Sequence, residues 1–204
     1  LYLLLLWITL PNLDDPKSLF AGQSTVITDR KGVELYRLFS EEDRTYVEGE
    51  AISPFVKKAI VAIEDERFFT RGCLDMRALA RVVFRFGKAG GASTLSRQLA
   101  RNALDLQNDS LVSRKLKELI LGCQLESKFT REELLELYLN WIPFGQNAYG
   151  VEQASHRYFG IPAKDLTLAQ SAILASLPQR PSYYSPYGSH VRTSVTPELT
   201  QKIV

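Results

Sequence analysis

From residue 53 onward, apolar residues recur with the period of an α-helix. The first apolar stripe consists of Val56, Ala59, Ile60 and Ile63. Ser53 followed by Pro54 has the form of a helix start, with Ser53 as the N-cap. Residues 130–133 and 167–170 match the capping box Thr-x-x-Glu/Gln, and each precedes an apolar run. The pattern therefore predicts a mainly α fold.

The N-terminal part of the chain follows other patterns. Residues 25–28 and 33–39 are rich in β-formers, and Asp29-Arg-Lys-Gly32 between them has the composition of a hairpin turn. The first ten residues are almost wholly apolar, whereas a membrane span needs about 20 residues. We interpret residues 1–12 as the end of a truncated transmembrane anchor and residues 13–50 as a juxtamembrane stalk with a β-hairpin. Residues 51–190 would form one compact catalytic domain, and residues 191–204 a truncated C-terminal segment.

Composition narrows the function classes. The formal net charge is only +2, with 25 Lys and Arg against 23 Asp and Glu, which argues against a nucleic-acid partner. The two cysteines are Cys73 and Cys123, and only two histidines accompany them, so a zinc site is not expected. We interpret both cysteines as buried small hydrophobic residues.

A first acidic block, Glu64-Asp-Glu-Arg-Phe-Phe69, follows the apolar stripe directly. Glu64 comes after Ile63 and before Phe68, so we expect its carboxylate in a partly dry cleft, a setting that suits a general base. The alternative is a solvated helix end whose acids take no part in chemistry.

A second block begins at Gly90-Gly91 and leads into a helix capped by Ser93 or Thr94. Three polar residues on one face of that helix are Gln98, Arg101 and Asn102. The free amides of a helix start favour anions, so this face is a candidate phosphate site. An ordinary amphipathic helix, with Leu95 and Leu99 toward the core, is the alternative.

A third block, Arg114-Lys-Leu-Lys-Glu118, lies in a helix for which we predict a buried stripe. That stripe would consist of Val112, Leu116, Leu119, Ile120 and Cys123. Arg114, Lys117 and Glu118 lie off its centre, which fits either a cationic cradle beside a carboxylate or an exposed ion pair.

Cations also recur about every fourth residue between the first two blocks. They are Arg77, Arg81, Arg85 and Lys88, interspersed with apolar residues. This pattern is typical of a helix lying on an anionic membrane, although a solvent-facing cationic surface gives the same pattern.

Taken in order, these blocks closely resemble the peptidoglycan glycosyltransferases of glycosyltransferase family 51, over residues 24–187. The matching pieces are Glu64-Asp-x-x-Phe68, Gly91-x-Ser-Thr-x-x-x-Gln-x-x-x-Asn102, Arg114-Lys-x-x-Glu118, Glu133-x-x-x-x-Tyr-Leu-Asn140 with Phe144-Gly145, and Tyr158-Phe-Gly160. The family comprises domains of class A penicillin-binding proteins and monofunctional transglycosylases. Five ordered blocks make chance similarity very improbable.

The resemblance implies a lysozyme-like fold with a large head lobe, a smaller membrane-associated jaw lobe and a short N-terminal β-rich stalk. The implied substrates are lipid II and the growing glycan chain on undecaprenyl pyrophosphate, and the product is a β-1,4-linked strand. The catalytic domain would then lie on the extracytoplasmic face of the bacterial cytoplasmic membrane. Transpeptidases and other cell-wall synthesis proteins are the implied partners.

The resemblance also assigns roles. Glu64 would be the catalytic base, and Glu118 would help the pyrophosphate to depart, directly or through Mg²⁺ or Mn²⁺. The implied donor-site residues are Gln98, Arg101, Asn102, Arg114 and Lys117, and the other motif residues are Asp65, Phe68, Ser93, Thr94 and Asn140. Arg101 stands where the family commonly has lysine.

The chain departs from the family after the first block. Where the family usually has His-x-Gly, this chain has Arg71-Gly72-Cys73. Cys73 would strain a turn that needs positive φ, and Arg71 cannot change protonation as histidine does.

Two other function classes fit parts of the pattern. A lysozyme-like glycan-cleaving enzyme can use a single glutamate as general acid, but it has no pyrophosphate for the cations near Glu118 to stabilise. A degenerate lipid II-binding or scaffold protein would account for the replacements at Arg71 and Cys73.

Overall fold

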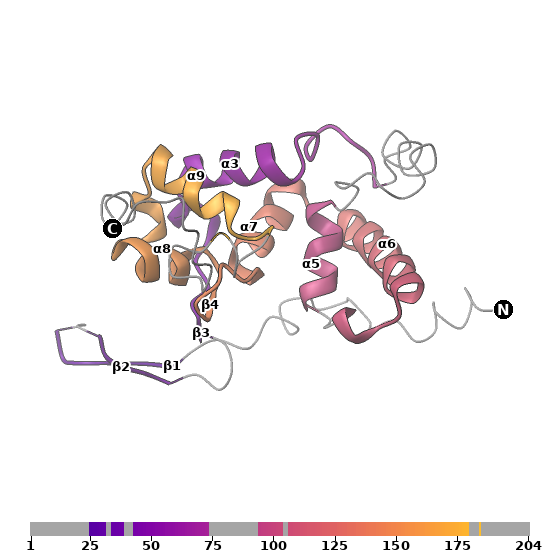
Figure 1. Cartoon of the computed structure of the whole chain (residues 1–204). Coiled ribbons are helices and arrows are strands. Elements are labelled where there is room, and N and C mark those ends of the chain that lie inside the picture. Colours follow the sequence, from indigo (N-terminus) through magenta and orange to yellow (C-terminus); the bar gives the residue numbers. More distant parts are fainter. Residues whose placement is uncertain are drawn as a thin grey trace, which may run out of the picture. The chain divides into compact units, whose positions relative to one another are not determined.

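The computed structural model describes residues 25–31, 34–38, 43–73, 94–103, 106–179 and 184 (Figure 1). The strands are β1 (Thr25–Thr28), β2 (Glu34–Leu38), β3 (Asp43–Arg44) and β4 (Ala148–Tyr149). The helices are α3 (Pro54–Glu64), α5 (Leu95–Ala103), α6 (Leu111–Lys128), α7 (Arg131–Trp141), α8 (Val151–Phe159) and α9 (Leu168–Ser176), with 3-10 turns η1 (Gly49–Ala51), η2 (Leu106–Asn108) and η3 (Ala163–Asp165). The predicted mainly α class is confirmed.

Some predicted features lie outside the described residues. They are the apolar segment 1–12, the cationic segment 77–88, Ser93 and the terminal segment 191–204. The division of the chain at residues 12, 50 and 190 stays a prediction. Among the residues that the structure describes, no helix combines the length and apolar character needed to cross a membrane.

The predicted hairpin is confirmed. β1 pairs with β2 in antiparallel fashion, with Thr25 opposite Leu38 and an irregularity between Ile27 and Thr28. In the turn, the side chain of Asp29 accepts a hydrogen bond of 2.8 Å from the backbone amide of Lys31. Aspartate favours turns because it bonds the backbone two residues further on in this way.

The chain divides into two compact units, and the division falls within α3 and α7. The first unit holds the described residues from Val61 to Tyr138. The second holds those of 22–60 and 139–204.

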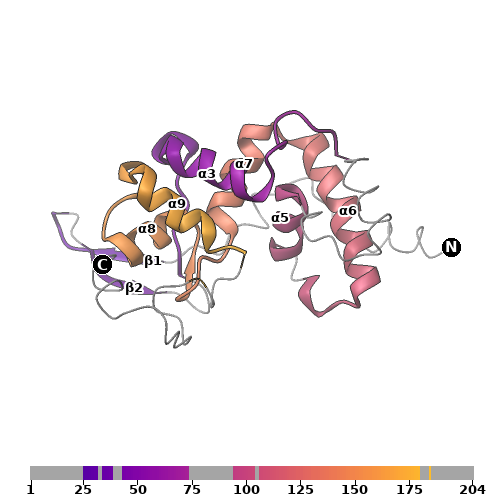
Figure 2. The ribbon, with the colours of Figure 1, turned by 45° about the horizontal axis from the view of Figure 1, so that its top comes forward.

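In the second unit, β3 and β4 form a short parallel pair, and α8 packs against β4, η3 and α9 (Figure 2). Asn140 ties this unit together, because its amide both donates to Val47 O and accepts from Val47 N, each at 2.8 Å. Gly150 has φ of 83°, and a Cβ there would lie 2.7 Å from the Asn140 carbonyl oxygen. Glycine at position 150 therefore permits this close approach.

The predicted helix starts are confirmed. Ser53 Oγ accepts from the amide of Phe55 and donates to Leu166 O at 2.9 Å. Residues 130–133 and 167–170 both form the reciprocal hydrogen bonds of a capping box. These local patterns predicted the structure well because capping involves only residues within one turn of each other.

In the first unit, α5 packs along α6, and Leu95 and Leu99 are buried as predicted. The prediction for the buried face of α6 was wrong. The buried residues are Glu118, Leu121, Gly122 and Leu125, whereas Val112 is 69% exposed. Glycine fits this face because a Cβ at position 122 would come within 2.9 Å of Arg97 Cγ.

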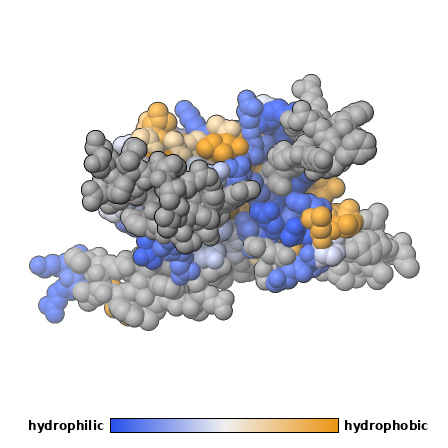
Figure 3. Space-filling view, viewed as in Figure 1, coloured by the Kyte–Doolittle hydropathy of each residue, from blue (hydrophilic) through white to orange (hydrophobic). Residues whose placement is uncertain are grey.

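Several large apolar side chains remain on the surface. On the face shown in Figure 3, apolar residues gather near α3 and α9 and along α6. Exposed large residues of these helices include Phe55, Ile63, Leu111, Val112 and Leu168. Ile63 was predicted on the buried stripe of α3, but it is 49% exposed. Only Val56 and Ile60 of that stripe are fully buried.

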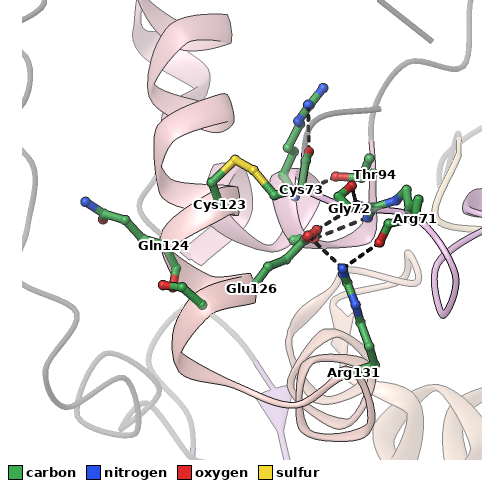
Figure 4. Close-up of a disulfide and its surroundings, with 11 residues drawn as sticks. Arg71, Gly72, Cys73, Thr94, Cys123, Gln124, Glu126 and Arg131 are labelled. Atoms are coloured by element: carbon green, nitrogen blue, oxygen red, sulfur yellow. Dashed lines mark hydrogen bonds and ion pairs between the residues drawn. A yellow bond between two sulfur atoms is a disulfide. The ribbon is translucent and has the colours of Figure 1, made fainter. Parts of the chain in front are cut away.

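The interpretation of the two cysteines as buried small hydrophobic residues was also wrong, because both are half-buried and bonded to each other. Cys73 and Cys123 form a disulfide, with their Cα atoms 5.1 Å apart, that joins the segment after α3 to α6 (Figure 4). Among the described non-glycine residues only Gln146 and Asn147 have positive φ, so Cys73 does not carry the strain expected for it.

We predict that this disulfide contributes about 2–4 kcal/mol to the free energy of unfolding, because it closes a long loop in the unfolded chain. Its cysteines are 50 positions apart. The double variant Cys73→Ser/Cys123→Ser is expected to unfold at a lower guanidinium concentration by far-UV circular dichroism. Dithiothreitol should lower the wild-type midpoint and leave that of the double variant in place. Equal midpoints for oxidised wild type and double variant would contradict the prediction.

Candidate active site

Glu64 is the last residue of α3, and its carboxylate has two unlike oxygens. Oε2 accepts a hydrogen bond of 2.7 Å from Gln98 Nε2 on α5. Oε1 is buried and has no hydrogen-bond partner within the described part of the chain. A buried polar atom without a partner is costly, and such atoms are often found where a substrate supplies the partner. The structure thus brings Glu64 into contact with Gln98 of the second block, a contact that the sequence did not predict.

Tyr138, on α7, fixes the orientation of the Gln98 amide. Its hydroxyl donates a hydrogen bond of 3.1 Å to Gln98 Oε1, and the residue is 0% exposed. Burial raises the pKa of Tyr138 well above its ordinary value, and the charge of Glu64 adds to this effect. Tyr138 therefore stays a donor, which leaves the NH₂ group of Gln98 directed at Glu64. Sequence analysis missed this role, although Tyr138 lies within the fourth matching block.

Asp65 holds the adjoining segments together. Arg71 donates to it from Nε at 3.0 Å and from Nη2 at 2.6 Å, and the amide of Leu95 donates to Asp65 Oδ2 at 3.3 Å. Phe68 is fully buried, with the guanidinium of Arg131 5.2 Å from its ring centroid. Asp65 and Phe68 thus have contacts that build the site.

Arg71 is the centre of a buried charged group, which we call the Arg71 cluster and which consists of Asp65, Arg71, Ser96, Glu126 and Arg131. Arg71 forms an ion pair of 2.6 Å with Asp65. The other ion pairs, shown in Figure 4, are Arg71 with Glu126 at 2.8 Å and Arg131 with Glu126 at 2.9 Å. Burial opposes the charge of Arg71, but hydrogen bonds from its guanidinium to Asp65 and Glu126 raise the pKa of Arg71. Burial likewise opposes the charge of Glu126, yet hydrogen bonds from Arg131, Ser96 and Arg71 lower the pKa of Glu126.

Glu118 lies in α6 with its side chain only 2% exposed. The ammonium of Lys115, one turn earlier, lies 2.6 Å from Oε2, and Arg114 Nε lies 3.8 Å from Oε1. The interpretation of this pair as an exposed ion pair is wrong, because the buried face of α6 includes Glu118. Of the cations predicted beside Glu118, Arg114 lies there and Lys115 joins it, and the function of this group as a cationic cradle stays a prediction.

The structure distinguishes Lys115 from Lys117. Lys117, which was predicted for the donor site, forms an ion pair of 2.8 Å with Asp109 before α6. Lys115, which was not, contacts Glu118. The spacing i, i+3 between Lys115 and Glu118 is the sequence signal that could have identified this contact.

The remaining predicted residues are placed as follows. Gln98, Arg101 and Asn102 are half-buried on one face of α5. Thr94 caps α5, since its Oγ1 accepts from the amide of Arg97 at 3.4 Å. Asn140 belongs to the second unit, where it bonds Val47. The role of each in binding stays a prediction.

Glu118 does not have the surroundings of a protein-built metal site. Mg²⁺ and Mn²⁺ prefer several oxygen ligands, whereas the groups nearest Glu118 are the cations Arg114 and Lys115. Nor does any group of three or more His, Cys, Asp or Glu side chains gather as metal ligands in the described ranges. We therefore derive no step through a metal ion.

The two acids differ in what they can do. Glu64 has a free lone pair in a dry setting and is suited to accepting a proton. Glu118 also has one buried oxygen without a hydrogen bond among the described residues, but Arg114 lies 3.8 Å from that oxygen and Lys115 contacts the other, and cations so placed are suited to stabilising an anionic group. Both acids belong to the first unit.

Similarity to known proteins identifies the family of this chain. The family model described as Transglycosylase matches residues 31–202. The chain is 40% identical over 176 residues to penicillin-binding protein 1F of Bacillus subtilis, 41% over 182 residues to penicillin-binding protein 1A of Clostridium tetani and 38% over 183 residues to penicillin-binding protein 1A of Aquifex aeolicus.

These alignments cover 84%, 85% and 86% of this chain but 24%, 23% and 25% of the respective relatives. The chain thus spans about a quarter of the length of the curated relatives that it matches. The extent of the family match, together with the paired acids and their partners, leads to one conclusion: this chain belongs to the transglycosylase family.

Proposed function

We propose that the chain is a peptidoglycan glycosyltransferase that polymerises lipid II into β-1,4-linked glycan strands. The observation that carries the proposal is the Glu64 carboxylate, which has one oxygen held by Gln98 and one buried oxygen without a partner. Membership of the transglycosylase family supports the same reaction.

In the proposed reaction, Glu64 Oε1 takes the proton from the 4-hydroxyl of the lipid II acceptor. The hydroxyl oxygen attacks the anomeric carbon of the donor chain as the bond from that carbon to pyrophosphate breaks. Configuration inverts, and undecaprenyl pyrophosphate leaves with the bonding electron pair. Because Gln98 donates to Oε2, a proton received from substrate would reside on Oε1.

The cations around Glu118 would stabilise the departing charge. Arg114 and Lys115 lie within 4 Å of the carboxylate, and their positive charge suits a pyrophosphate leaving group. Glu118 would position these two side chains. A divalent ion, if the reaction uses one, would need ligands beyond this set.

The finer features of the family belong to the same proposal. They are head and jaw lobes, an N-terminal stalk and membrane association on the extracytoplasmic face, with lipid II, the growing chain and transpeptidases as partners. The Cys73–Cys123 disulfide supports an extracytoplasmic location, because disulfides persist mainly in oxidising compartments. The relatives' names identify them as penicillin-binding proteins.

A central prediction is that Glu64→Gln abolishes polymerisation, with a loss of about 100-fold or more, because the amide cannot accept the proton. Labelled lipid II in detergent is incubated with wild-type or variant protein, with Mg²⁺ or EDTA, and strand length is read on gels. Glu66→Gln, at an exposed neighbouring position, is the control and should retain activity. Lipid II that binds wild type but is never polymerised would favour a scaffold protein instead.

Lys115 and Lys117 offer a matched pair. We expect Lys115→Ala to reduce kcat/KM by about 10- to 100-fold, because it removes a cation at Glu118. Lys117→Ala should cost less, because Asp109 engages that ammonium. Lys128→Ala, at an exposed position of the same helix, should match wild type. A larger loss in Lys117→Ala than in Lys115→Ala would show that the donor site uses Lys117.

Tyr138→Phe tests the orientation of the Gln98 amide. We expect kcat to fall about 3- to 10-fold and stability by about 1 kcal/mol, because the hydrogen bond to Gln98 is lost. Tyr158→Phe is the matched control, since it removes another buried hydroxyl, which bonds Phe144 O at 2.9 Å in the second unit. If both variants lose stability but retain equal kcat, Tyr138 has no part in orienting Gln98.

A further inference from the structure

Arg71 and Cys73, the two departures from the family pattern that follow the first block, both contact α6. Arg71 forms an ion pair of 2.8 Å with Glu126, and Cys73 is bonded to Cys123. Cys123 and Glu126 are three residues apart, so they lie on the same face of α6. Figure 4 shows both connections side by side. The segment after α3 is therefore attached to α6 at two neighbouring points.

Arg71 also determines where the end of α3 lies. Its side chain is only 3% exposed, and it holds both oxygens of Asp65, the residue next to Glu64. Asp65 accepts in turn from the amide of Leu95, the first residue of α5. Gln98 follows on the first turn of that helix. Arg71 thus joins, through Asp65, the two segments whose side chains meet in the 2.7 Å contact between Glu64 and Gln98.

In this cluster Arg71 is a permanent cation placed between two acids. The acids that face Arg71 are Asp65 from the end of α3 and Glu126 from α6, and the other cations nearby are Arg97 from α5 and Arg131 from α7. Arg131 already engages the second oxygen of Glu126. A neutral residue at position 71 would leave Asp65 buried without an ionic partner.

We propose that Arg71 is a positioning residue for the glycosyl transfer: it holds Glu64 against Gln98, and the Cys73–Cys123 disulfide holds the segment that carries Arg71. This inference rests on the proposed function. Arginine suits the task because its planar guanidinium reaches two carboxylates at once. Arg71 and Cys73 thus act on the same segment: the ion pairs of Arg71 and the disulfide of Cys73 both attach it to α6.

Arg71→His tests the proposal through pH. An imidazole between two buried acids has a pKa above its ordinary value of about 6.5. A raised pKa means that the cation is present at low pH and is lost as pH rises through that value. We therefore expect the kcat of Arg71→His, divided by that of wild type at the same pH, to fall about tenfold between roughly pH 6 and 8.5. KM for lipid II should change little.

Two controls separate positioning from general damage. Arg71→Gln has no titrating group, so its kcat ratio should be low at every pH. Arg157→His places a histidine at an exposed position of α8 in the second unit, and its ratio should stay near one throughout. A ratio for Arg71→His that is as flat as that of Arg157→His would overturn the proposal.

If the histidine variant does not fold, Arg71→Lys replaces it. Lysine keeps the charge but has a single nitrogen, so it cannot reproduce the separate contacts of Nε and Nη2 with Asp65 and of Nη1 with Glu126. We expect a loss in kcat of about tenfold at unchanged KM, whereas a wild-type kcat would overturn the proposal. Wild-type protein that makes no polymer would overturn the proposed function and this inference with it. An active wild type with a flat Arg71→His ratio would overturn this inference alone.

Discussion

The first unit is organised by the need to bury carboxylates with partners. An ionised carboxylate in an apolar interior is strongly unfavourable unless cations or hydrogen-bond donors surround it. Asp65 and Glu126 meet this need through the guanidiniums of the Arg71 cluster, and in doing so they connect α3, α5, α6 and α7. Glu64 has a hydrogen-bond donor on only one oxygen, from Gln98. The fully paired acids fix the geometry, and the half-paired acid is left able to react.

The fold could be predicted from the sequence wherever the determining contacts are local. The hairpin and the helix starts at residues 53, 130 and 167 depend on side chains within a few positions of one another. The buried face of α6 could not be predicted from its apolar residues, because it includes Glu118 and Gly122. The Cys73–Cys123 pairing spans 50 positions and depends on tertiary structure. Two cysteines alone do not indicate whether they meet.

For the candidate site, the motifs predicted only some of the side-chain contacts that the structure shows. The acid at position 64 and the amide at position 98 were assigned to one site, and they are hydrogen-bonded. Of the two cations predicted beside Glu118, Arg114 lies there, but Lys117 pairs with Asp109 and Lys115 takes its place. Both lysines are within one turn of Glu118, and only packing distinguishes them. The residues that fix these groups from behind, Tyr138 and Arg71, have no chemical signature in the sequence. Their roles depend on burial, which becomes visible only once the helices are packed.

The hydrogen-bond direction at Glu64 bears on the choice between glycosyl transfer and glycan cleavage. A cleaving enzyme of the lysozyme type needs a glutamic acid that donates a proton to the leaving oxygen. Here buried Tyr138 donates to Gln98, and Gln98 donates to Glu64. Both hydrogen bonds are therefore directed toward the carboxylate. A carboxylate that already accepts on one oxygen, with a lone pair available on the other, is prepared to receive a proton. Transfer to an acceptor hydroxyl requires such a base, and the cations at Glu118 suit the anionic leaving group that transfer, unlike cleavage, produces.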